Sequence, residues 1–155
     1  MFMLLVSAGF YTYAINAAFV KRVIPQVKIA EIPHVPKYFL GHITFDGKPV
    51  PVADLSLIIR GIPSSNCLHT RVVLLNHSGE GDGLFGILAE KVTEALELDL
   101  SNFVESSIHP EGLPFLGPTL NNNGSAIQWL DVDKLYLFLR SETRPADDIK
   151  TPGRK

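Results

Sequence analysis

Proline and glycine recur along this chain, and their spacing constrains its fold more than any other sequence feature. Eleven prolines and twelve glycines are spread over 155 residues. They divide most of the chain into short runs rich in Val, Ile, Leu and Phe, which favour strands. We therefore predict a mainly β protein of many short strands, arranged as small barrels rather than as a layered α/β sheet.

The residues that interrupt the apolar runs also predict where the helices, strands and turns lie. Asp46-Gly47 is the strongest hairpin signal, because both residues tolerate the positive φ of a type I′ turn. Asp54 is expected to cap a short helix ending at Arg60, and Asp131 a helix over Val132 to Leu139. Strands are expected near residues 2–8, 10–15, 20–29, 39–46, 48–53, 70–77, 84–92, 94–98, 114–120 and 125–130.

The first twenty residues, MFMLLVSAGFYTYAINAAFV, carry no charge and precede Lys21-Arg22. A secretory signal has its positive residues before the apolar run, whereas here they follow it. A membrane span needs about 20 almost wholly apolar residues, and Ser7, Thr12 and Asn16 interrupt this one. We therefore expect no membrane insertion and interpret the segment as a β-hairpin. Candidates for its core side are Phe2, Leu4, Val6, Tyr13 and Ile15.

Composition and net charge limit which other classes of protein this chain can belong to. The net charge of −2 and a pI near 6.2 provide no basic field of the kind that attracts nucleic acid. The one cysteine, Cys67, cannot form an internal disulfide, which suits a reducing, cytoplasmic compartment. Residues 1–140 are expected to form one domain, and residues 141–155, with much charge and little to bury, a disordered tail.

A literal G-x-G-x-x-G runs from Gly81 to Gly86, with Asp99 downstream. It leaves open a nucleotide-dependent enzyme. A dinucleotide site needs the first glycine at the end of a strand and a helix opening at the last. Here five residues intervene after the strand, and Ile87 and Leu88 have strand character. A glycine-rich hairpin loop is the other interpretation.

No other pattern indicates catalysis, a metal or a cofactor. The five histidines lack the H-x-x-x-H spacing that places two ligands on one face, and no C-x-x-C accompanies them. No serine stands in a G-x-S-x-G or S-x-x-K setting. These observations favour a binding module over an enzyme.

Several segments together resemble the CheW-like family of chemotaxis coupling proteins. YAINAAFVKRVIPQVKIAEIPHVPKYFLGHITFDGKPVPVADL, from Tyr13 to Leu55, follows the family's hairpin, proline-containing strand and G-x-x-N-x-R-G-x-x-x-P-V-x-D-L pattern. GILAEKVTEALEL, PFLGP and AIQWLDVDKLYLF continue the likeness in the family's order. LAEKVTEALELD, FLGP and IQWL look most similar to the accessory proteins of Wsp-type surface-sensing systems.

The resemblance implies two small five-stranded SH3-like barrels with a hydrophobic interface between them. It implies a non-catalytic scaffold that couples the cytoplasmic tip of a methyl-accepting receptor to the regulatory domain of a CheA-type histidine kinase. Such a protein is cytoplasmic and meets the membrane only through its receptor. The partner-contact positions that the family motifs imply are Val20, Arg22, Val23, Gly41, Asp46, Pro51, Val92 and Gly117.

Two positions depart from the family pattern. The family's arginine falls on Asp46 and its usual glutamate on Arg22. If the two positions face each other, Arg22 and Asp46 keep an ion pair with its polarity swapped, which would select partners with compensating charges. The alternatives are independent drift at two solvated positions and the turn chemistry of Asp46 alone.

Overall fold

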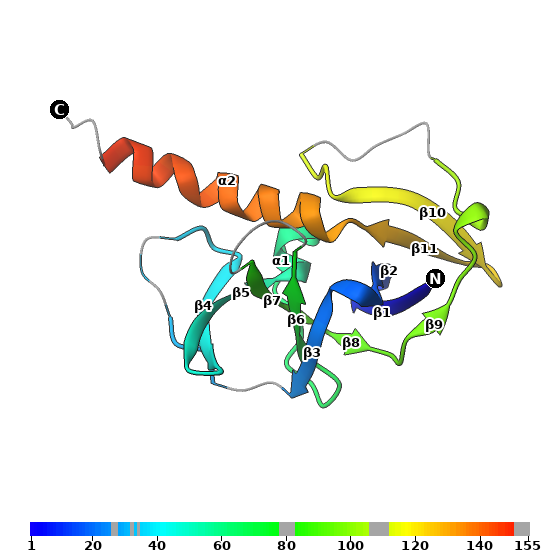
Figure 1. Cartoon of the computed structure of the whole chain (residues 1–155), viewed down its shortest axis with the longest axis horizontal. Coiled ribbons are helices and arrows are strands. Elements are labelled where there is room, and N and C mark those ends of the chain that lie inside the picture. The colour runs from blue at the N-terminus through cyan, green and yellow to red at the C-terminus, as the bar shows by residue number, and fades with distance from the viewer. Residues whose placement is uncertain (26–27, 32, 34, 78–82, 106–111, 151–155) are drawn as a thin grey trace.

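The computed structural model describes residues 1–25, 28–31, 33, 35–77, 83–105 and 112–150. Its strands form two sheets that lie side by side (Figure 1). Sheet A has six strands: β1 (Phe2–Ala8), β2 (Tyr11–Asn16), β8 (Lys91–Val92), β9 (Leu96–Glu97), β10 (Leu116–Asn122) and β11 (Ser125–Leu130). Sheet B has five: β3 (Val20–Pro25), β4 (Phe39–Phe45), β5 (Lys48–Asp54), β6 (Arg71–Asn76) and β7 (Leu84–Ala89).

Sheet B is contiguous in sequence, whereas sheet A is assembled from both ends of the described chain. The strand order of sheet A is β10-β11-β2-β1-β8, with β9 also pairing with β1. The order of sheet B is β3-β6-β7-β5-β4. Most neighbours are antiparallel, but β11–β2 and β5–β7 are parallel. The chain therefore leaves sheet A after β2, completes sheet B, and returns.

Side chains on the two faces of each sheet enter different cores. Leu4 and Val6 of β1 face a core shared with sheet B, while Met3 faces a small core of sheet A with Ala14. Sheet B likewise has a core of its own. Its buried members are Ile43, Val50, Val52, Val72, Leu74 and Leu88. Two small β units joined by an apolar interface are what the family resemblance implies, and the mainly β fold is confirmed.

The edges of sheet B approach each other without a continuous ladder. β3 and β4 are the end strands of the pairing order. After β3, Ala30 makes an antiparallel bridge with His42 of β4, with N–O distances of 2.9 and 2.8 Å. Gly41, with φ of 141°, lies beside this bridge, and a Cβ there would collide with the Ala30 carbonyl. Close approach of the two segments thus requires glycine.

The predicted hairpin at Asp46-Gly47 is confirmed. Phe45 pairs directly with Lys48, so the loop has two residues. Their φ values, 51° for Asp46 and 76° for Gly47, are those of a type I′ turn. Strand β5 then runs to Asp54, and the turn sets the register of the β4–β5 pair as far as Gly41, beyond which the register shifts by one residue.

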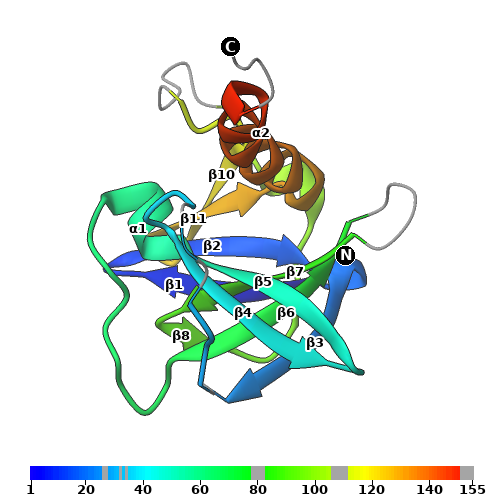
Figure 2. The ribbon, with the colours of Figure 1, turned by 90° about the vertical axis from the view of Figure 1, so that its left-hand side faces the viewer.

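The helices are few. α1 (Leu55–Arg60) begins at Asp54, as predicted, and ends at Gly61 with φ of 72°. α2 (Val132–Lys150) starts after β11, runs above sheet B, and its last turns extend past β4 (Figures 1 and 2). It is longer than the predicted helix, which ended at Leu139; residues 151–155 lie outside the described residues, and disorder of the tail stays a prediction. The described residues also contain two short 3-10 turns, η1 (Ala17–Phe19) and η2 (Leu100–Asn102).

Several sequence expectations need correction. Phe2 is 57% exposed rather than in the core, because it lies at the start of β1 opposite Glu97 of the short strand β9. Strand β3 ends at Pro25, not at residue 29. The single strand expected over 84–92 is two, β7 and β8, separated by Glu90. No helix in the described ranges is long and apolar enough to cross a lipid bilayer.

Candidate functional site

The eight predicted contact residues do not form one site. Val20, Arg22 and Val23 lie on β3, and Gly41, Asp46 and Pro51 lie on or between β4 and β5. All six therefore belong to sheet B or its hairpin. Val92 and Gly117 lie instead on β8 and β10, which are at opposite ends of the strand order of sheet A.

The six residues of sheet B differ in what they expose. Val20 is partly buried against the shared core, as is Val92 of sheet A, so packing accounts for both valines. Gly41 has no side chain to offer and serves the close approach to Ala30. Arg22, Val23 and Asp46 are exposed. Of the six, these three and the partly buried Pro51 therefore have side-chain surface outside the cores, and contact with a partner stays a prediction for all of them.

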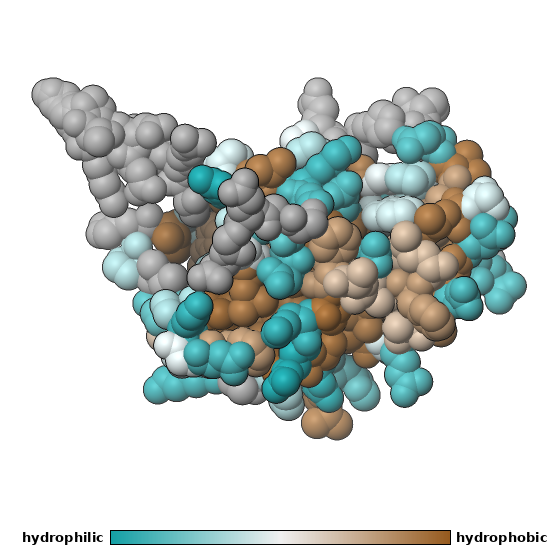
Figure 3. Space-filling model, in the orientation of Figure 1, coloured by the Kyte–Doolittle hydropathy of each residue, from teal (hydrophilic) through white to brown (hydrophobic). Residues whose placement is uncertain are grey.

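A groove lies between the β4–β5 hairpin and α2, and we call it the α2 groove. One part, of about 590 Å³, runs from Lys21 and Asp46 to Tyr136. A second part, of about 290 Å³, continues to Arg140. Both parts share Pro51, Phe85 and Tyr136, so they are continuous. Figure 3 shows apolar surface below α2 and over sheet B, interrupted by hydrophilic side chains.

Aromatic contacts hold the wall of the α2 groove in place. The Tyr136 ring stacks on His77 with centroids 3.8 Å apart and an interplanar angle of 11°. It also meets the Phe85 ring at 5.6 Å. Nδ1 of His77 is 3.7 Å from a carboxylate oxygen of Asp133, one turn earlier in α2. The first turns of α2 are thereby fixed against the ends of β6 and β7.

The predicted ion pair between Arg22 and Asp46 is not formed. Both residues lie in the described part of the chain, where the ion pairs found join other groups. The Arg22 guanidinium lies instead over the ring of Phe45, 5.4 Å from its centre. Asp46 borders the α2 groove, on which Lys21 and Lys48 also lie. The two positions are near neighbours, but Arg22 uses an aromatic face rather than the carboxylate.

Sequence reasoning missed most of the groove lining. Phe39, Phe85 and Tyr136 come from β4, β7 and α2, and each has the apolar or aromatic character expected of any core residue. No local pattern distinguishes a groove residue from a core residue. The available signal was weak: Pro51, already assigned from the family motif, lines both parts of the groove.

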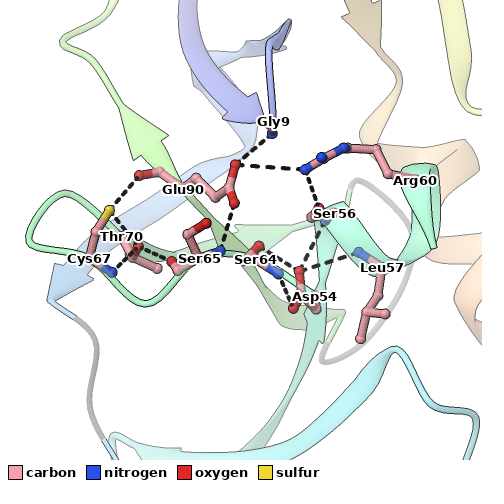
Figure 4. A network of polar contacts seen from close by, with 10 residues as sticks. All are labelled: Gly9, Asp54, Ser56, Leu57, Arg60, Ser64, Ser65, Cys67, Thr70 and Glu90. Carbon is pink, nitrogen blue, oxygen red and sulfur yellow. Dashed lines mark hydrogen bonds and ion pairs between the residues drawn. The ribbon is translucent and has the colours of Figure 1, made fainter. Parts of the chain in front are cut away.

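Apart from the groove, a polar cluster joins sheet A to sheet B near the C-terminal end of α1 (Figure 4). Glu90 accepts hydrogen bonds from the backbone N–H of Gly9 at 2.5 Å and of Ser65 at 2.6 Å, and lies 4.0 Å from Arg60. The bonds from Ser65 and Gly9 lower the pKa of the Glu90 carboxyl below its usual value. This cluster fixes the segment after α1 rather than forming a cavity.

Asp54 anchors the same segment from the other side (Figure 4). It is 2% exposed and caps α1 by accepting from the N–H groups of Ser56 and Leu57. It also accepts from the N–H of Ser64 at 2.9 Å and from its hydroxyl at 2.6 Å. The exposed Cys67 is 3.3 Å from the Thr70 hydroxyl, a contact that lowers the pKa of the thiol. These contacts are structural.

The glycine-rich motif has no dinucleotide geometry where it is described. Gly86 lies inside β7, which is antiparallel to β6, and no helix opens there. A Cβ at Gly86 would lie 3.1 Å from Val72 and 3.3 Å from Leu74, which explains the glycine by packing. Gly81 and Asp82 lie outside the described residues. Among the described side chains, no three His, Cys, Asp or Glu groups are gathered as metal ligands would be.

Comparison with known families decides the relationship of the chain. A model of the CheW-like domain matches residues 3–137, nearly the whole of both sheets and the start of α2. The chain belongs to the CheW-like domain family. This CheW-like chain also superposes on the crystal structure of the scaffolding protein TtCheW from Thermoanaerobacter tengcongensis. The TM-score is 0.73 at 20% identity, covering 84% of this chain and 88% of the other.

The likeness to TtCheW concerns the fold, since identity is low. Among curated protein sequences, none matches this CheW-like chain. The matched range includes all strand residues of the two sheets except Phe2 and ends at Leu137, within α2. The α2 groove therefore lies in the part of the chain that the family model covers, except for its end at Leu139 and Arg140.

Proposed function

We propose that this protein is a non-catalytic scaffold of chemotaxis-type signalling. It would couple the cytoplasmic tip of a methyl-accepting receptor to the regulatory domain of a CheA-type histidine kinase, in the cytoplasm. The observation that carries the proposal is the α2 groove: an apolar cleft, bordered by Asp46 and Pro51, in a chain of the CheW-like family.

The chemistry of the groove supports binding rather than catalysis. Pro51, Phe85 and Tyr136 offer apolar and aromatic surface, which gains free energy when a partner removes it from water. The walls are preformed, since Tyr136 is held by His77 and Phe85. A rigid site loses little entropy on binding. These are properties of a docking surface for a protein segment.

The segments LAEKVTEALELD, FLGP and IQWL are similar to those of accessory proteins in Wsp-type surface-sensing systems. We therefore propose that this protein acts in such a system. In that setting Arg22 and Asp46, which reverse the family's charges, would favour a cognate kinase and receptor over those of other systems. A methyl-accepting receptor and a CheA-type kinase of such a system are therefore the partners to test.

Binding to those two partners tests the proposal. Calorimetry with the kinase regulatory domain and with a receptor-tip fragment should give saturable binding by the unmodified chain. Pro51→Glu places a charge in the groove and should weaken binding of at least one partner about tenfold or more. Pro63→Glu, at an exposed position outside the groove, is the matched control and should bind normally.

Absence of binding to both partners would overturn the scaffold proposal. The competing enzyme hypothesis predicts the opposite pattern. Titration with ATP and with dinucleotides should then show saturable micromolar binding, whereas the scaffold should capture a histidine kinase without any such ligand.

A further inference from the structure

The turn between β10 and β11 carries the one Asn-Gly pair of the chain, Asn123-Gly124. Asn122 pairs with Ser125 across the turn, so the loop has two residues. Their φ values are 51° for Asn123 and 86° for Gly124. Asn123 is exposed, and the turn lies at the end of the hairpin farther from α2 (Figure 1). We infer that this turn is a site of spontaneous deamidation whose rate is controlled by the side chain of Asn121.

The reacting atoms belong to two adjacent residues. The backbone nitrogen of Gly124, after losing its proton, attacks the side-chain carbonyl carbon of Asn123. The new C–N bond closes a five-membered succinimide ring, and the C–N bond to the side-chain amide breaks, so ammonia leaves. Water then opens the ring at either carbonyl and gives aspartate or isoaspartate. One water is consumed and one ammonia released, and the reaction is intramolecular, which favours it.

Glycine at position 124 makes the attacking nitrogen accessible. A side chain after an asparagine crowds the backbone nitrogen that must attack, and glycine has none. Among the described residues, a Cβ built at Gly124 would meet no atom within 4 Å apart from its chain neighbours. The turn is therefore open to the water that opens the ring. Each of the other asparagines in the chain is followed by a residue with a side chain, so Asn123 is the preferred position.

Asn121 restrains the attacking nitrogen in the folded protein. The N–H of Gly124 donates a hydrogen bond to Oδ1 of Asn121, with an N–O distance of 3.2 Å. The nitrogen must lose this proton and leave the bond before it can attack. The bond therefore stabilises the unreacted state, and a bond of this kind corresponds to about fivefold in rate. Because it depends on the turn conformation, the folded chain should react more slowly than the unfolded chain.

The other two-residue hairpin turn indicates which product fits the fold. Asp46-Gly47 has φ values of 51° and 76°, close to those of Asn123-Gly124. Aspartate at position 123 therefore suits the turn. Isoaspartate adds one methylene group to the main chain, so a type I′ loop of two residues can no longer close the pair between Asn122 and Ser125. One product adds a negative charge, and the other also shortens the β10–β11 ladder.

The test follows the full chain by peptide mass spectrometry during storage at mildly alkaline pH. We expect the mass change of an amide converted to an acid to accumulate at Asn123 before any other asparagine. Isoaspartate is measured in parallel, as methyl groups transferred to the chain by a protein isoaspartate methyltransferase. Hydrogen exchange near Ser125 should be faster in the isoaspartate form than in the Asn123→Asp variant, which keeps the turn.

Three variants test the control by Asn121. Asn121→Ala removes the acceptor and should speed deamidation of the folded chain about fivefold. Asn121→Asp keeps an acceptor oxygen and should restore the slow rate. Asn122→Ala, at an exposed position in the same hairpin, is the matched control and should react as the unmodified chain does. In concentrated urea all four proteins should react at the same rate, since the hydrogen bond is lost with the fold.

Three results would overturn the inference. They are an Asn123 that stays unmodified in the folded chain while the urea-unfolded chain is converted, faster conversion of another asparagine, or equal rates in folded Asn121→Ala and the unmodified chain. The inference goes beyond the scaffold proposal and does not rest on it. Asn121, Asn123 and Gly124 do not line the α2 groove, so none of these results bears on partner binding there.

Discussion

The Arg22 guanidinium carbon lies 5.4 Å from the centre of the Phe45 ring, joining the two edge strands of sheet B through a cation–π contact. The strands themselves are end members of the pairing order, and the Ala30–His42 bridge is the backbone contact that links β4 to the chain after β3. Arg22 and Phe45 therefore help to close a β unit in which the described strands β3 and β4 do not pair with each other.

Double-mutant cycles should separate this contact from the ion pair that the sequence suggested. Arg22→Ala with Phe45→Leu should show a coupling free energy of about 0.5–1 kcal/mol, typical of an exposed cation–π pair. Arg22→Ala with Asp46→Ala should show coupling near zero, since no ion pair joins them. Urea unfolding of the three single variants, the two double variants and the unmodified chain measures both couplings. The reverse order of the two couplings would contradict the structure.

Two glycines with the same predicted role should respond differently to alanine. Gly41→Ala should reduce the free energy of unfolding by more than about 2 kcal/mol, because its φ is 141° and a Cβ would meet the Ala30 carbonyl. Gly117→Ala should cost less than about 1 kcal/mol, since a Cβ there would lie 3.5 Å from Trp129, an ordinary contact. Chemical denaturation checks both. Similar losses of stability in the two variants would show that the close approach of Ala30 does not require glycine at position 41.

Asp54 should be the more important of two aspartates that cap helical turns. Asp54→Ala should lower the free energy of unfolding by about 2–4 kcal/mol, because the cap and both bonds to Ser64 are lost inside the protein. Asp99 caps η2 in the same way but is exposed, so Asp99→Ala should change stability little. Thermal and urea unfolding of the two variants gives the comparison. Equal losses would mean that burial of Asp54 adds nothing.

Glu90 should make stability depend on acid pH. Hydrogen bonds from the Ser65 and Gly9 backbone lower its pKa in the folded state, below the ordinary 4.5. The unfolded chain therefore binds this proton more readily, and the stabilisation is fully present above about pH 4.5 and is lost as pH falls through the folded pKa. Glu90→Gln should lower the free energy of unfolding at pH 7 by about 1–3 kcal/mol. It should also reduce the acid limb, which is the fall in that free energy as pH decreases below about 4.5.

Urea unfolding of this variant between about pH 7 and pH 3 tests the prediction. Glu94→Gln, at an exposed neighbouring position, is the matched control and should keep the acid limb of the unmodified chain. An unchanged limb in Glu90→Gln would assign the pH dependence to other carboxyls.

Features encoded in adjacent residues were the ones that sequence could predict. Asp46-Gly47 and the Asp54 cap each depend on backbone preferences of two to four neighbouring residues, and both are confirmed. Burial of both faces of β1 was harder to predict from the sequence. Met3 and Leu4 enter different cores, and which core receives which face depends on strands far along the chain.

The candidate site was predictable only in part, for the same reason. Pro51 and Asp46 were found through a motif, but the groove exists because Phe85 and Tyr136 are brought to the same hairpin from β7 and α2. The contact between Arg22 and Phe45 likewise depends on how β3 and β4 approach each other, and no short sequence pattern predicts that approach. Such arrangements arise from tertiary packing, where many sequences satisfy the same local rule.

The insertion of sheet B within sheet A also orders events during synthesis. When a ribosome has released residues up to Ala89, all five strands of sheet B are available to pair, but β1 and β2 still lack β8, β9 and β11. Strands β8 and β9 follow within eight residues, but β11, the neighbour of β2, is complete only at Leu130, about 40 residues later, or roughly two to eight seconds at ordinary elongation rates. Sheet A is in this sense finished last although it is begun first, so the edge of β2 that pairs with β11 stays unpaired during that interval.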